Sequence, residues 1–236
     1  MMLKKSILSI FSLLVLGLSS VFAHAIWIET ASSGQKGQTQ EIKIYFGEFA
    51  TDDISSASDW FSDLSQFELK WVKPDGSSTV IPHKANGNHF LASFTPESEG
   101  AHKLVLQKTA SDISYGYRLD YMASAKVQIG EEALQANRQL PVAIEATTKN
   151  GSVGKALLLK HEKDISLQGE QEITVVSPNS WTKRLYPDEK GQISFTPLWP
   201  GKYLIETTVT DKNKGELNGK PYDVQFSCHT EVLEVK

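Results

Sequence analysis

The sequence predicts an all-β fold: two consecutive immunoglobulin-like or prealbumin-like β-sandwich domains that follow a signal peptide. Three observations predict it. Apolar and polar residues alternate in many short runs, turn signals made of Gly, Pro, Asn and Asp separate these runs, and only residues 55–66 have a helix-like pattern. Short alternating strands with a turn about every 8–12 residues are typical of β-sandwiches.

Residues 1–23 have the pattern of a secretory signal peptide. Lys4 and Lys5 precede an apolar run over 7–18, and the small residue Ala23 ends the segment. A basic start, an apolar stretch and a small-residue cleavage site define such a signal. The run is shorter than the ~20 residues that a membrane-spanning helix needs. We therefore expect a secreted protein, periplasmic in a Gram-negative bacterium, whose mature chain has no stable membrane span.

Two cleavage sites fit the small-x-small rule. One follows Ala23, with Val21 two residues before it, and the other follows Ala25, because Ala23-His24-Ala25 has the same pattern. We favour cleavage after Ala23. It makes His24 the first residue of the mature protein, whereas cleavage after Ala25 removes it.

The N-terminal domain is predicted over residues 24–136. In the run over 41–46, Ile42, Ile44 and Phe46 share one face, which indicates a half-buried strand. A second strand is expected over 67–72. Turns are expected at Pro74-Asp75-Gly76 and Asn86-Gly87. The remaining predicted strands of this domain cover residues 89–94, 102–108 and 117–129.

The C-terminal domain is predicted over residues 137–236, after a connector at about 130–137. Polar residues 211–220, with Gly215 and Gly219, are interpreted as a long hairpin loop. The predicted strands on either side of it cover residues 140–148, 172–177, 181–186, 192–196, 202–210 and 222–235.

Composition and missing motifs exclude several functions. The net charge of −4 leaves no basic excess for nucleic acid, and a single cysteine excludes an internal disulfide or a multi-cysteine zinc site. Neither a G-x-S-x-G nor an H-E-x-x-H motif occurs. Cys228 lies beside His229 without a nucleophile signature, so we interpret it as a buried structural thiol. The sequence predicts that the protein is not an enzyme.

Six histidines are the remaining candidates for chemistry, and His24 is the strongest. At a mature N-terminus, its α-amine and ring nitrogen can chelate one metal ion, because both lose their protons near neutral pH. Such nitrogen ligands suit Cu(II) or Ni(II). His102 opens a predicted strand and His229 lies in the last one, so these two residues are candidates to complete the site.

Several short motifs resemble one bacterial family. The chain has Ala23-His24-Ala25-Ile26-Trp27-Ile28-Glu29, Phe67-Glu68-Leu69 before Pro74-Asp75-Gly76, Gly100-Ala101-His102, Ala125-Lys126-Val127 before Gly130, and His229-Thr230 before Leu233. These motifs resemble the uncharacterised-domain family described as the periplasmic component of nickel/cobalt transport systems. The segment over 188–203 is similar to that family's second domain, a carboxypeptidase-regulatory-like sandwich. The resemblance implies nickel or cobalt, and a transport component of the inner or outer membrane as partner. Because the His24 nitrogens also suit copper, the expected cofactor is a divalent transition metal (Ni, Co or Cu).

Two functions follow as hypotheses. The first is a periplasmic metal-binding protein, accessory to nickel/cobalt or copper uptake or handling, with His24, His102 and His229 as ligands. The second is a metal-free envelope interaction module that binds a protein or a glycan. Its candidate contacts are the aromatic residues Trp60, Phe61, Trp181, Tyr186 and Trp199. Clustered histidines would favour the first function, and scattered histidines the second.

Overall fold

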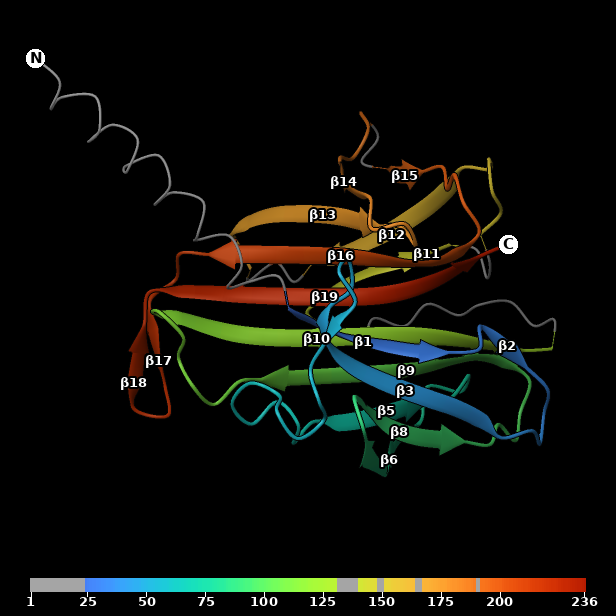
Figure 1. The fold of residues 1–236 in the computed structure, drawn as a ribbon, viewed down its shortest axis with the longest axis horizontal. Coiled ribbons are helices and arrows are strands. Elements are labelled where there is room, and N and C mark those ends of the chain that lie inside the picture. The colour runs from blue at the N-terminus through green and yellow to red at the C-terminus, as the bar shows by residue number, and fades with distance from the viewer. Residues whose placement is uncertain (1–23, 131–139, 148–150, 164–166, 190–191) are drawn as a thin grey trace, which may run out of the picture.

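A computed structural model of the chain describes residues 24–130, 140–147, 151–163, 167–189 and 192–236 (Figure 1). The predicted signal peptide, 1–23, lies outside the described residues. The strands are β1 Ala25–Thr30, β2 Ser33–Gly34, β3 Gln40–Glu48, β4 Asp53–Ile54, β5 Glu68–Val72, β6 Ser78–Ile81, β7 His83–Asn86, β8 His89–Phe94, β9 Gly100–Thr109, β10 Tyr117–Ile129, β11 Val142–Ala146, β12 Leu157–Lys163, β13 Glu170–Val176, β14 Thr182–Leu185, β15 Ile193–Phe195, β16 Gly201–Asp211, β17 Gly215–Leu217, β18 Lys220–Tyr222 and β19 Val224–Val235.

One large sheet runs through both halves of the chain. Its strand order is β14-β13-β16-β19-β10-β9-β5-β6, and β2 adds to β10. The two halves join where β10 pairs with β19 in parallel, from Tyr117 opposite Val224 to Ser124 opposite Glu231. The predicted boundary at 136/137 falls in residues that are not described. The division into two domains therefore stays a prediction, and the structure adds that the two halves share a sheet.

A second sheet, in the order β1-β3-β8-β7, packs on one face of the large sheet. Alternate residues of β1 and β3 point inward, so Ile28 and Ile44 join Leu104 and Val127 in the main core, all of them fully or almost fully buried. Burying an aliphatic side chain of this size stabilises the fold by about 1.5–3 kcal/mol. The period-two pattern of the sequence thus marks the residues that hold these two layers together.

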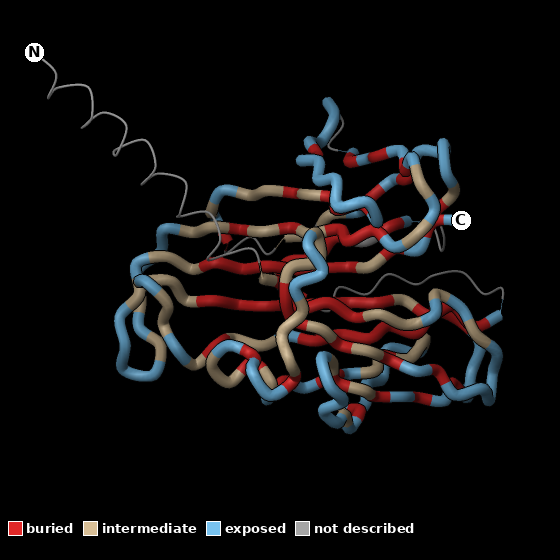
Figure 2. Tube along the Cα trace, viewed as in Figure 1, coloured by how far each residue is buried: buried red, intermediate tan, exposed pale blue. Residues whose placement is uncertain are grey.

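A third sheet, β11-β12-β15, covers the opposite face of the large sheet. Ile144 and Leu159 from this sheet pack against Val175, Ile205 and Leu233. Strands β10 and β19 are therefore covered on both faces, and Figure 2 shows them as long buried stretches through the middle of the molecule. Stacked sheets with apolar interiors confirm the predicted all-β sandwich fold class.

Most predicted strands occur at their predicted positions. Those over 89–94 and 117–129 have the bounds of β8 and β10, and the polar excursion over 211–220 contains the hairpin of β17 and β18. The helix-like interpretation of 55–66 is wrong. These residues form turns and bends, with Ser62 at a φ of 55°, while Trp60 and Leu64 are buried in the main core. Over the part of the chain that is described, no helix is long and apolar enough to cross a membrane.

Candidate functional site

His102 on β9 is a fully buried histidine with both ring nitrogens engaged. Nδ1 accepts a hydrogen bond from the indole N–H of Trp71 at 2.9 Å, and Nε2 donates to the carbonyl oxygen of Ser98 at 3.0 Å. The ring also contacts the rings of Trp71 and Phe94. A metal ligand needs a free nitrogen lone pair facing the ion. In this arrangement the Nδ1 lone pair is used and Nε2 carries a proton.

His229 on β19 is held in the same way on the opposite face of the large sheet. Its Nδ1 accepts the backbone N–H of Ile144 at 3.2 Å, and its Nε2 lies 2.9 Å from the hydroxyl oxygen of Ser124. Because Nδ1 is the acceptor, Nε2 carries the proton and donates it to Ser124. A catalytic dyad needs the reverse, a ring nitrogen that accepts the serine proton. The two hydrogen bonds of His229 therefore connect the middle of β19 to β10 and β11.

The three predicted ligands do not come together. His102 is opposite Val127 on β10 and His229 is opposite Met122, so five residues of strand, about 16 Å, separate their register positions. The two histidines also face different sheets. His24 lies before β1, half-buried, with its ring 5.4 Å from that of Phe46. Across the described ranges, no group of three or more His, Cys, Asp or Glu side chains is placed to hold a metal ion.

The single cysteine is buried beside an acid. The thiol of Cys228 donates a hydrogen bond to the carboxyl group of Glu206 at 3.6 Å. Burial raises the pKa of Cys228 well above its usual range and raises the pKa of Glu206 to about 7. Reactive cysteines have a lowered pKa and are partly exposed, so this thiol has the properties of a structural one.

A cleft of about 360 Å³ lies where β1 meets β10, β16 and β19. Charges of both signs line it. Lys202 forms an ion pair with Glu29, and Lys43 lies 3.4 Å from Glu41. Because these groups neutralise one another in pairs, the cleft favours neither an anionic nor a cationic ligand.

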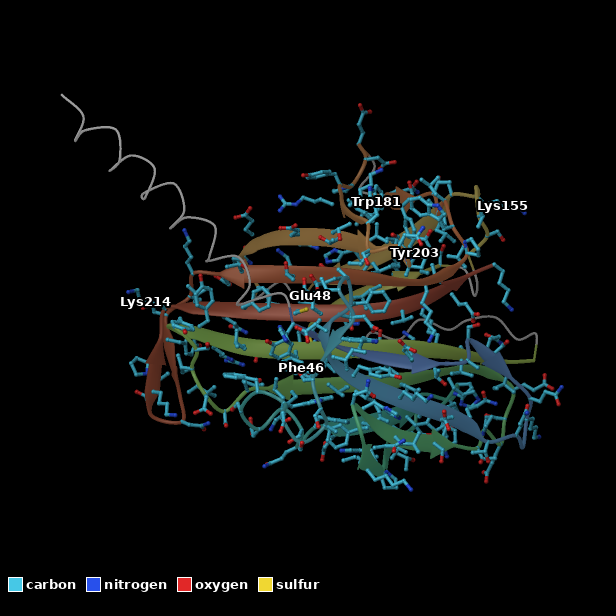
Figure 3. All side chains as sticks on the ribbon, in the orientation of Figure 1. Phe46, Glu48, Lys155, Trp181, Tyr203 and Lys214 are labelled. Atoms are coloured by element: carbon cyan, nitrogen blue, oxygen red, sulfur yellow. The ribbon has the colours of Figure 1, made fainter. Side chains whose placement is uncertain are left out.

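The clearest candidate contact surface lies at one end of the C-terminal layer. We call it the tip: residues 151–156, 177–183 and 196–202. The backbone N–H of Gly154 donates to the carbonyl oxygen of Pro197 at 2.9 Å, and the indole rings of Trp181 and Trp199 meet edge to face, with centroids 6.4 Å apart and an angle of 67° between them. Figure 3 labels Lys155, Trp181 and Tyr203 in this region.

Tyr203 fixes the backbone of the tip. Its ring is buried against Phe195, and its hydroxyl group both donates to the carbonyl oxygen of Trp199 at 2.9 Å and accepts the N–H of the same residue at 3.1 Å. A tyrosine near the start of a strand that bonds to the backbone a few residues upstream is a tyrosine corner, a feature of immunoglobulin-like sandwiches. Trp199 therefore sits on a rigid loop.

The tip exposes apolar and basic side chains together. Leu198, Trp181 and Val153 are 57%, 44% and 43% exposed. Lys155 and Lys183 are exposed as well, and their ammonium groups have no ion pair among the described residues. The three segments contain no Asp or Glu. The charged side chains of the three segments are therefore all lysines, and the neighbouring acids Glu29 and Glu234 lie on the side of Lys202.

Of the five aromatic residues that the sequence suggested as contacts, the structure brings two together, Trp181 and Trp199. Trp60 is buried in the main core, and Phe61 and Tyr186 lie outside the tip. Sequence reasoning missed Leu198 and Val153. The signal that could have found them is the presence of apolar residues within turn segments rich in Pro and Gly, where no core face exists to bury them.

Comparisons with known proteins leave the family open. No protein-family model matches the chain, and no curated protein matches it. Among solved structures, the chain is similar to the crystal structure of murine CEACAM1b, with 12% sequence identity over 89% of this chain and 100% of that chain and a TM-score of 0.24. A likeness at this score carries no argument about function.

Proposed function

We propose that the chain is an exported, non-catalytic binding module of the periplasm that contacts its partner through the tip. The observation that carries this proposal is the exposure of Trp181 and Leu198 on a backbone that Tyr203 holds in place. Tryptophan is among the residues that contribute most to binding energy. A rigid loop also loses little conformational entropy when it binds.

The arrangement of the histidines supports the same proposal. His102 and His229 bond to Trp71, Ser98, Ser124 and Ile144, and these contacts connect neighbouring strands and layers. Their role is then to hold the sheets that support the tip. This is the scattered arrangement that the metal-free hypothesis expects.

Binding to isolated cell envelopes tests the proposal. We expect the purified mature protein to sediment with envelopes of its source organism, and the double variant Trp181→Ala/Leu198→Ala to bind at least tenfold more weakly. The matched control is Val80→Ala/Tyr115→Ala, which removes exposed apolar side chains elsewhere. Equal binding by the tip variant and the wild type would refute the proposal.

A second candidate function is metal binding through His24 alone, for delivery to a nickel/cobalt or copper transport component. The observation in its favour is that the half-buried His24 ring contacts Phe46 and has no hydrogen bond among the described residues. Calorimetric titration of mature protein with a verified N-terminus tests it. Micromolar binding of Ni(II) or Cu(II) that persists in His24→Ala would refute this site.

A further inference from the structure

We propose that the partner of the tip is the surface of an anionic phospholipid bilayer. This inference rests on the proposed function and names the chemistry of the partner. Three observations carry it: Lys155 and Lys183 have no ion pair among the described residues, apolar side chains are exposed on rigid loops, and the two tryptophans meet edge to face.

The charge of the tip is complementary to an anionic surface. Lys155 and Lys183 stand beside the exposed apolar residues, and neither has an acidic partner among the described residues. The third lysine, Lys202, is turned to Glu29 in an ion pair and lies opposite Glu234 in the strand register. Two positive charges therefore remain available to lipid phosphates.

The opposite end of the molecule gives the contrast. Lys214 near the β17–β18 hairpin lies 2.9 Å from Asp223, and Lys220 lies 2.9 Å from Asp112. Figure 3 shows Lys214 at the far end of the long axis from Lys155. Lys214 and Lys220 are thus paired with acids, whereas Lys155 and Lys183 of the tip have no ion pair among the described residues. The mature chain is acidic overall, so its free positive charge at the tip can orient it on a membrane.

The apolar part of the tip has the composition of a membrane-interface contact. Tryptophan is enriched at the level of lipid headgroups, because its ring is apolar and its indole N–H is polar. Trp181 and Leu198 project from loops that also carry Pro and Gly, and both are about half exposed. Insertion of these side chains into the headgroup region would bury their apolar surface without refolding of the sandwich.

The geometry of the two rings argues against a glycan. A sugar ring stacks best on a flat aromatic face, and neighbouring faces in one plane extend such a platform. Trp181 and Trp199 meet at 67°, with the edge of one ring against the face of the other, so they do not share a plane. A fluid lipid interface imposes no such requirement on ring orientation.

Vesicle binding tests the inference. We expect the mature protein to float with protein-free vesicles of phosphatidylglycerol and phosphatidylcholine, and not with vesicles of phosphatidylcholine alone. Each lysine near an anionic surface strengthens binding about fivefold, which corresponds to ~1 kcal/mol. Lys155→Gln/Lys183→Gln should therefore bind about 25-fold more weakly at low salt, and added salt should weaken the wild type. The charge-matched control Lys36→Gln/Lys212→Gln, at exposed sites outside the tip, should lose little.

The outcomes separate the two proposals. Flotation that requires phosphatidylglycerol and is lost in Trp181→Ala/Leu198→Ala supports the lipid surface. Tip-dependent binding to whole envelopes without binding to the protein-free vesicles overturns the lipid inference and leaves the binding module, with a protein or glycan as partner. Equal losses in the lysine variant and its control overturn the assignment to the tip. Absence of binding to vesicles and to envelopes overturns both proposals.

Discussion

Replacing Tyr203 by Phe removes one hydroxyl group and keeps the buried ring in its contact with Phe195. Tyr203 is 2% exposed, and its hydroxyl group makes two hydrogen bonds to the backbone of Trp199. Each bond contributes about 0.5–1.5 kcal/mol, and leaving a buried backbone group without a partner costs about 1–3 kcal/mol. Because Trp199 is only half-buried, water can replace part of what is lost. We expect Tyr203→Phe to lower the free energy of unfolding by about 2 kcal/mol.

Urea denaturation followed by far-ultraviolet circular dichroism measures this difference. The midpoint should fall while the m-value stays unchanged, because the native core remains the same. Loosening of the Trp199 loop should also weaken the near-ultraviolet signal of the two tip tryptophans and reduce envelope binding. Tyr115→Phe is the matched control, since Tyr115 is 85% exposed. A loss below about 0.5 kcal/mol for Tyr203→Phe would contradict the role given to the tyrosine corner.

Three further predictions concern titration and metal. Burial raises the pKa of Glu206 from 4.5 to about 7, so ionising this carboxyl group lowers the stability of the folded protein progressively as the pH rises from about 4.5 to 7. The stability difference between Glu206→Gln and the wild type, measured by urea titration, should therefore shift in favour of the variant by about 1–3 kcal/mol between pH 4 and pH 8. A difference that stays the same at both pH values would refute this. Burial alone would raise the pKa of Asp63, but its hydrogen bonds and the charge of Lys108 outweigh burial and lower the pKa to about 2. Asp63→Asn should therefore lower the free energy of unfolding by about 1 kcal/mol at pH 7 and by almost nothing at pH 2. Equal losses at both pH values would count against this prediction. His102→Gln and His229→Gln should leave the calorimetric affinity for Ni(II) and Cu(II) unchanged, and a tenfold loss in either variant would place that histidine at a metal.

The local pattern of the sequence was enough for most strands and for the fold class. The short runs over 117–129 and 89–94, bounded by turn residues, predict β10 and β8 with their bounds. Strand β8 alternates buried and more exposed residues, whereas β10 is buried along most of its length because sheets cover both of its faces. The parallel pairing of Tyr117 with Val224 could not be predicted in this way. A strand's pattern says which residues are buried and does not say which distant strand lies beside it.

The helix-like interpretation of 55–66 was wrong for a related reason. Polar residues followed by Trp60 and Leu64 suggested a capped turn of helix, but these apolar side chains fill the main core from a chain of turns. Tertiary packing outweighed local propensity there. Likewise, nothing local distinguishes a histidine that holds two strands together from one that binds a metal, so the hydrogen bonds of His102 and His229 came only from the structure.

Hydrogen–deuterium exchange of the mature protein, with and without isolated envelopes, tests whether the protein binds its partner through the tip. We expect slower exchange in residues 151–156, 177–183 and 196–202 on binding, with little change around His24 or in the β17–β18 hairpin. Protection that spares these three segments and falls elsewhere on the sandwich would show that the tip is not the binding surface.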